Sequence, residues 1–236
     1  MMNQEDLEKR ISEIEEDFKK VEFNGWKGAF IDGIINPTNY LVAHSKIMWI
    51  LKEVNSDEED RTLLINFLRN PKDEVSGIKK GWAGTFNRIA YTTYGILNDK
   101  LWHQIPNIHE SYQVIQSIND IAYTNVKKVP GGSRSQYEEL VEFHNKYGWI
   151  LEKQIKLYEP EIIICGGTGD ILDKMFTEIL PDTWKPIGNN EKNPKFYDYG
   201  NKLLIYTYHP RNSVMTNENY CNSIIEKVLW WKNKKS

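Results

Sequence analysis

Several features are scarce in this chain of 236 residues, and each scarcity excludes a class of protein. Only two cysteines occur, Cys165 and Cys221, which are too few for a disulfide framework, an iron–sulfur cluster or a cysteine-rich zinc site and are typical of a reducing compartment. No stretch approaches the roughly 20 apolar residues that cross a bilayer, and the N-terminus is charged instead of apolar. The sequence therefore predicts a cytoplasmic protein with no membrane partner.

Positive charge is not in excess either, since the formal net charge is -3. A protein that coats nucleic acid through bulk electrostatics carries a basic surplus, so any contact with nucleic acid must be local. Metal-ligand spacing of the His-Glu-x-x-His type does not occur, and the Gly-rich turn at residues 166–170 follows a late strand instead of the first one. We therefore expect neither a metal ion nor another cofactor.

Apolar residues, by contrast, make up 40% of the chain, which is enough for a core. Short apolar runs bounded by polar residues predict strands that are buried on both faces, whereas apolar positions three or four apart predict amphipathic helices. Strands are expected at residues 46–51, 120–126, 161–165 and 202–208. Helices are expected at 60–70, 84–97, 136–158 and 217–231, with another that begins soon after residue 166.

Strands that alternate with helices predict an α/β fold, a three-layer sandwich in which a central four-stranded, mainly parallel sheet is flanked by helices. Residues 1–45 carry an amphipathic helix and a turn-rich connector, so we expect them to form an N-terminal helical extension packed on an α/β domain of residues 46–236. Parallel strands end along one edge of their sheet, and such sheets bind ligands there.

Polar residues and glycines suited to a binding site follow each of the four predicted strands. Pro210 ends ladder pairing and keeps the residue before it extended, so we expect the His209 imidazole to enter a cleft near Asn125 and the Glu53–Asn55 turn. The candidates are Glu53 and Asn55 after the first strand, Asn125, Lys127 and Arg134 after the second, Gly166 after the third, and His209, Arg211 and Ser213 after the fourth.

The order of these loops resembles the uracil-DNA glycosylase superfamily, particularly its short bacterial and archaeal branch. In that family a buried strand ends in a Gly-Glu-Ala-Pro-Gly-like motif, which LKEVNS matches with Glu53 at the acidic position. The next strand ends in a Thr-Asn-Val-Val-Lys-like motif followed by Pro, Gly and Arg, which YTNVKKVPGGSR matches. The segments KQIKLYEPEIIICGG and YHPRNS match the two later motifs, so the resemblance covers roughly residue 46 to the C-terminus.

This resemblance implies a DNA glycosylase, which hydrolyses the N-glycosidic bond of a deaminated or modified base such as uracil after the base leaves the stack. By the resemblance, His209 stabilises the departing base, Asn125 reads its edge, and Glu53 or Asn55 positions the water. Trp82 is a candidate stacking platform for the base, and Gly166 lets the backbone approach it. The residues implied to hold the DNA backbone are Lys127, Arg134, Arg211 and Ser213.

The chain also departs from the family pattern. The first motif lacks its glycine and proline, and Lys52 and Val54 stand in the neighbouring places. Arg211 replaces the serine that usually follows His-Pro. The four cysteines that bind an iron–sulfur cluster in that branch are missing. These departures leave open a non-catalytic nucleic-acid or nucleobase-binding protein that retains the fold, and a hydrolase that acts on a free nucleoside. Each candidate also has a structural interpretation, with the His-Pro pair as a turn, Asn125 as a turn residue and Trp82 as core.

Overall fold

The computed structural model describes residues 3–54, 56, 59–132, 135–180, 185–188 and 191–235. In this part of the chain the central sheet has seven strands in the order β3-β5-β4-β6-β9-β8-β7, and helices complete an α/β fold. The strands are β3 (Gly33–Ile34), β4 (Ile47–Leu51), β5 (Ala122–Asn125), β6 (Ile162–Gly166), β7 (Lys185–Pro186), β8 (Lys195–Asp198) and β9 (Leu203–Thr207).

The four strands expected from the apolar runs are confirmed as β5, β4, β6 and β9, which lie side by side and parallel in the middle of the sheet. Every residue in them is buried, which explains why β4, β6 and most of β9 are continuous apolar runs instead of alternating ones. β5 differs, because it ends in the buried polar residues Thr124 and Asn125. Because they are parallel, the loops that follow them meet at one edge of the sheet.

The prediction of a four-stranded sheet is wrong in its extent, because three short strands are added at its two sides. β3 pairs antiparallel with β5, while β8 pairs antiparallel with β9 and in turn with β7. Strands of two residues, such as β3 and β7, are too short to show a period of apolar residues. Their pairing depends on the neighbouring strand, so the local sequence does not reveal them.

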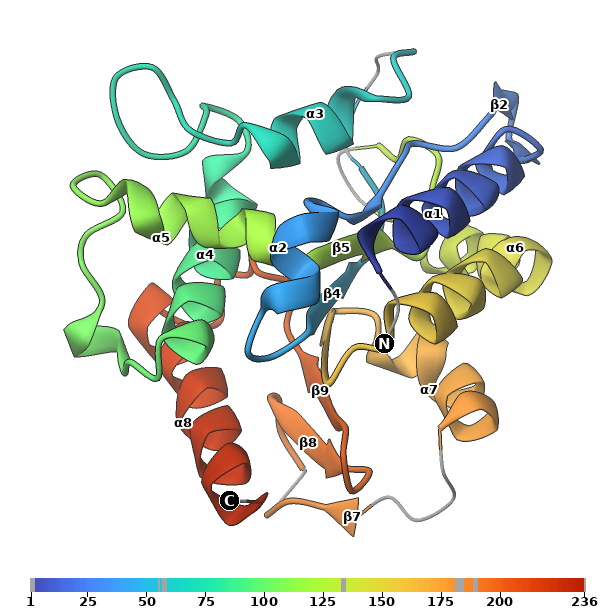
Figure 1. Cartoon of the computed structure of the whole chain (residues 1–236). Coiled ribbons are helices and arrows are strands. Elements are labelled where there is room, and N and C mark those ends of the chain that lie inside the picture. Colours follow the sequence, from blue (N-terminus) through green and yellow to red (C-terminus); the bar gives the residue numbers. More distant parts are fainter. Residues whose placement is uncertain are drawn as a thin grey trace.

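Helices cover both faces of the sheet (Figure 1). Trp49 and Met48 are neighbours on β4 but belong to different hydrophobic clusters, because successive strand residues point to opposite faces. None of the helices in the described ranges is long and apolar enough to cross a bilayer. On the Trp49 face lie α3 (Leu63–Arg69), α4 (Ala83–Leu97), α5 (Tyr112–Gln116) and α8 (Asn217–Lys235), and on the Met48 face lie α1 (Gln4–Phe18), α6 (Tyr137–Tyr158) and α7 (Gly169–Ile179).

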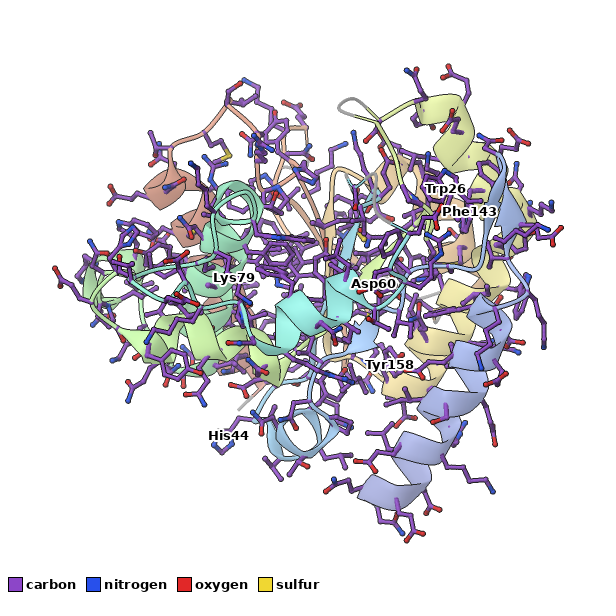
Figure 2. All side chains as sticks on the ribbon, turned by 90° about the horizontal axis from the view of Figure 1, so that it is seen from above. Trp26, His44, Asp60, Lys79, Phe143 and Tyr158 are labelled. Atoms are coloured by element: carbon purple, nitrogen blue, oxygen red, sulfur yellow. The ribbon has the colours of Figure 1, made fainter. Side chains whose placement is uncertain are left out.

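The N-terminal segment joins the sheet as well as covering it. After α1 the chain forms a hairpin of β1 (Glu22–Phe23) and β2 (Trp26–Lys27), then β3, then α2 (Pro37–Val42). The hairpin packs on α6, where the Phe23 and Phe143 rings lie 5.2 Å apart. Trp26 pairs with Phe23 across the hairpin, and Figure 2 labels both Trp26 and Phe143. The expectation of a purely helical extension is therefore incomplete, because β3 supplies one strand of the central sheet.

Candidate functional site

A cleft of about 940 Å³ lies where the parallel strands end. The segment after β4, the start of α4, β5 and the turn after β9 contribute to its walls. Four of the residues proposed from the sequence therefore share one cleft, and Lys52 and Tyr123 join them. The lining includes Lys52, Glu53, Trp82, Tyr123, His209 and Arg211.

His209 lies in the turn that follows β9. The Asn212 backbone N–H donates to the His209 carbonyl at 2.8 Å, so Pro210 occupies the second position of a β-turn, where its fixed φ is favourable. The Arg211 backbone N–H donates to His209 Nδ1 at 3.1 Å, which leaves the proton of the neutral ring on Nε2. Burial, and then the charges of Lys52 and Arg211, lower the pKa of His209 to about 4. At neutral pH the ring is thus an uncharged hydrogen-bond donor.

Glu53 follows β4 and lies against the backbone of Gly131. The Gly131 N–H donates to the Val54 carbonyl at 2.9 Å, and a Cβ on Gly131 would lie 2.6 Å from both Glu53 Cδ and Oε1. A larger residue at position 131 would therefore displace this carboxylate. Glu53 Oε2 is buried and has no hydrogen-bond partner among the described residues, so it can accept a hydrogen bond from water or a ligand.

Aromatic rings form one wall of the cleft. Trp82, just before α4, stacks on Phe67 with 4.0 Å between ring centroids and 12° between planes, while Phe86 and Tyr123 lie 5.2 Å apart. Because Phe67 covers one face of the indole, a ligand can reach only its other face or its edge. This wall can hold a planar ring through apolar burial and stacking.

Asn125 does not line the cleft. It is completely buried, its N–H donates to Asp32 Oδ2 at 2.9 Å, and its Oδ1 accepts a long hydrogen bond of 3.4 Å from the Tyr123 hydroxyl. Its Nδ2 has no acceptor among the described residues. Because Tyr123 lines the cleft, its hydroxyl connects the Asn125 amide to the cleft.

A buried ion pair holds the end of β5 to the N-terminal segment. Asp32 accepts hydrogen bonds from Lys128 Nζ at 2.8 and 3.0 Å and from Gln154 Nε2 at 2.9 Å, in addition to the Asn125 N–H. Burial lowers the pKa of Lys128, although Asp32 opposes the shift. The sequence interpretation missed Asp32 and expected Lys128 at the surface or on a phosphate, since the partner of Lys128 comes from a distant segment.

Three further candidates that the structure describes lie outside the cleft. Lys127 is 3% exposed and pairs with Glu139 at 2.6 Å, so its ammonium does not face solvent. Gly166 is buried at the end of β6, where a Cβ would lie 3.0 Å from Pro210 Cδ; its close packing supports the His209 turn. Ser213 is exposed but does not line the cleft. Asn55 and Arg134 fall outside the described residues.

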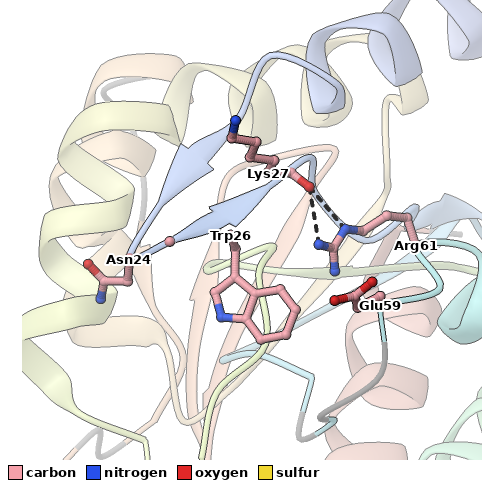
Figure 3. A pocket seen from close by; sticks show the side chains of 6 residues that line it. Asn24, Trp26, Lys27, Glu59 and Arg61 are labelled. Atoms are coloured by element: carbon pink, nitrogen blue, oxygen red, sulfur yellow. Dashed lines mark hydrogen bonds between the residues drawn. The ribbon is translucent and has the colours of Figure 1, made fainter.

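A second, open hollow of about 630 Å³ lies beside the β1–β2 hairpin (Figure 3). The Arg61 guanidinium lies 4.9 Å from the Trp26 ring and donates to the Lys27 carbonyl through Nε at 3.2 Å and Nη2 at 3.1 Å. Glu59 also lines this hollow. None of the residues proposed from the sequence lines it.

Within the described ranges, no group of three or more His, Cys, Asp and Glu side chains is arranged to hold a metal ion. No protein-family model and no curated protein matches the sequence of this chain.

Proposed function

We propose that this chain is a DNA glycosylase-like hydrolase that cleaves the N-glycosidic bond of a deaminated or modified base such as uracil. The observation that supports this proposal is the meeting of a neutral His209, the Glu53 carboxylate and an aromatic wall in one cleft. The mostly parallel sheet with helices on both faces is compatible with the three-layer sandwich of the superfamily that the sequence resembles. We infer DNA as the partner, contacted locally.

In this proposal a base flipped out of the stack binds against Trp82, Phe86 and Tyr123. As the bond from C1′ to the base nitrogen breaks, its electron pair leaves with the base and spreads to a carbonyl oxygen. The His209 Nε2–H donates to that oxygen, and a donor placed where charge develops stabilises the transition state more than the bound substrate.

Glu53 supplies the second half of the reaction. Its unpartnered Oε2 accepts a hydrogen bond from water, whose oxygen forms the new bond to C1′, and its negative charge stabilises the cationic sugar. The water proton passes to the carboxylate and then to the departed base. The products are the free base and an abasic sugar.

The test uses oligonucleotides that each carry one uracil, hypoxanthine or other damaged base, with free base measured by chromatography. His209→Ala is expected to slow release by about 100-fold or more, and Glu53→Gln by a similar factor. His103→Ala is the matched control, because His103 is exposed and does not line the cleft. No release from any substrate by the folded protein contradicts the proposal.

A non-catalytic nucleic-acid or nucleobase binder is the second candidate. The buried Asn125 amide and the pairing of Lys127 with Glu139 favour it, since two groups expected to contact DNA or its base are buried inside the protein. Salt-dependent binding of uracil-containing DNA without any release of base would select this candidate.

A further inference from the structure

The described residues that line the cleft carry more positive than negative charge, although the whole chain has a net charge of -3. Among the described residues that line it, Lys52 and Arg211 are cations and Glu53 is the only acid. Neither cationic side chain has an ion-pair partner in the described ranges. Two cations in a partly enclosed cleft repel each other, and an anion bound between them would relieve the repulsion.

Lys52 lies directly beside His209. Gly167 has φ +75, and a Cβ placed on it would be 3.3 Å from Lys52 Cε and 3.4 Å from His209 Cβ. Both side chains therefore pass over the same glycine. Arg211 reaches toward the start of α4, where a Cβ on Gly84 would lie 3.3 Å from its Nε. Both cations also lower the pKa of His209, as expected for charges at short range.

We propose that Lys52 and Arg211 form a phosphate subsite beside His209, so that the cleft selects a phosphate-bearing nucleotide over a free nucleoside. The identity of the bound ring rests on the proposed function, whereas the phosphate subsite does not. A guanidinium can hold two phosphate oxygens at once, and an ammonium adds a point charge. Lys52 thereby has the phosphate-binding role that the sequence analysis gave to Lys127, because the Lys127 ammonium is paired with Glu139. The phosphate can come from a DNA strand or from a nucleoside monophosphate.

The experiment compares the affinities of deoxyuridine, deoxyuridine 5′-monophosphate and a short oligonucleotide that contains 2′-fluoro-deoxyuridine, which resists hydrolysis. At least one phosphate-bearing ligand is expected to bind about tenfold or more tightly than deoxyuridine. Lys52→Met should reduce this ratio by about tenfold, and Lys52→Arg should keep most of it. Lys80→Met is the matched control, because Lys80 is exposed and does not line the cleft.

A second measurement shows whether the Lys52→Met protein is folded and whether the charge acts locally. NMR titration of His209 should give a pKa above the value of about 4 in the parent chain, since one of the two depressing charges is gone. An unchanged affinity ratio in folded Lys52→Met protein overturns the proposal. A preference for the oligonucleotide alone identifies a phosphodiester as the ligand, and a preference for the monophosphate shows that one phosphate is enough.

The two proposals fail separately. Tighter binding of phosphate-bearing ligands without release of any base contradicts the proposed glycosylase activity and supports the phosphate subsite. Release of base together with equal affinities for deoxyuridine and both phosphate-bearing ligands contradicts the phosphate subsite and supports the proposed glycosylase activity.

Discussion

Replacing one partner of the Asp32–Lys128 pair should destabilise the fold strongly. The Lys128 side chain is 1% exposed and the Asp32 side chain 0%, so neither charge can be solvated by water. In Asp32→Asn the acceptors left to the ammonium among the described residues are neutral: Thr124 Oγ1 at 2.6 Å, the Asn125 carbonyl at 3.1 Å and the new amide. Removing one partner of a buried ion pair costs about 3–5 kcal/mol, a large share of the roughly 5–15 kcal/mol that stabilises a domain.

Urea unfolding of four proteins measures this cost: the parent chain, Asp32→Asn, Lys128→Met, and the double variant. Each single substitution should lower the free energy of unfolding by about 3 kcal/mol or more, and the melting temperature by roughly 6–20 °C. The double variant should lose less than the sum of the two single losses, by about 2 kcal/mol, because no unpaired charge is left buried.

The reasoning is refuted if both single substitutions cost less than about 1 kcal/mol, or if their effects add without coupling. Additive losses would mean that each side chain acts through its other contacts, such as the Asp32 carboxylate with Gln154, and not through the pair. Lys153→Met tests for a general effect of removing a lysine, because Lys153 pairs with Asp17 but is 53% exposed. That substitution should cost no more than about 1 kcal/mol.

Two further predictions concern the cleft. The pKa of His209 is about 4 in the folded protein and 6.5 in the unfolded chain, so between these pH values the unfolded state binds one more proton than the folded state. The free energy of unfolding should therefore fall as the pH drops from 6.5 to 4. His209→Asn should make the free energy of unfolding, measured with urea, depend less on pH in this range. Because His209 stays neutral down to about pH 4, the rate of base release should not fall as the pH drops through 6.5. Gly131→Ala should displace Glu53 and reduce base release by roughly tenfold to 100-fold, measured with the uracil oligonucleotide.

Gly132→Ala is the control for the Gly131 substitution, since Gly132 also borders the cleft but a Cβ there meets no atom of the described residues within 4 Å. Equal activity of the Gly131→Ala and Gly132→Ala proteins would contradict the inferred contact between Gly131 and Glu53. A His209 imidazole that titrates near 6.5 by NMR would contradict the burial and charge effects argued for it.

The local sequence was enough to predict the centre of the fold. β4, β6 and β9 are buried on both faces, and such strands are nearly continuous apolar runs whatever their neighbours are. β5 is buried as well, although it ends in the polar residues Thr124 and Asn125. The helices between them show their own apolar spacing. Once strands and helices alternate, the handedness of the crossovers brings the loops with Glu53 and His209 to the same edge of the sheet.

The tertiary structure alone decided which side chains face the cleft. β3 exists because Gly33 and Ile34 lie beside β5, and a two-residue strand has no pattern of its own. Lys127 and Lys128 are adjacent in sequence, yet one pairs with Glu139 and the other with Asp32. Lys52, which the sequence interpretation did not select, lines the cleft instead. Whether a lysine contacts a ligand or an internal carboxylate depends on which distant segments pack against it. The residues next to the lysine in sequence do not determine these partners.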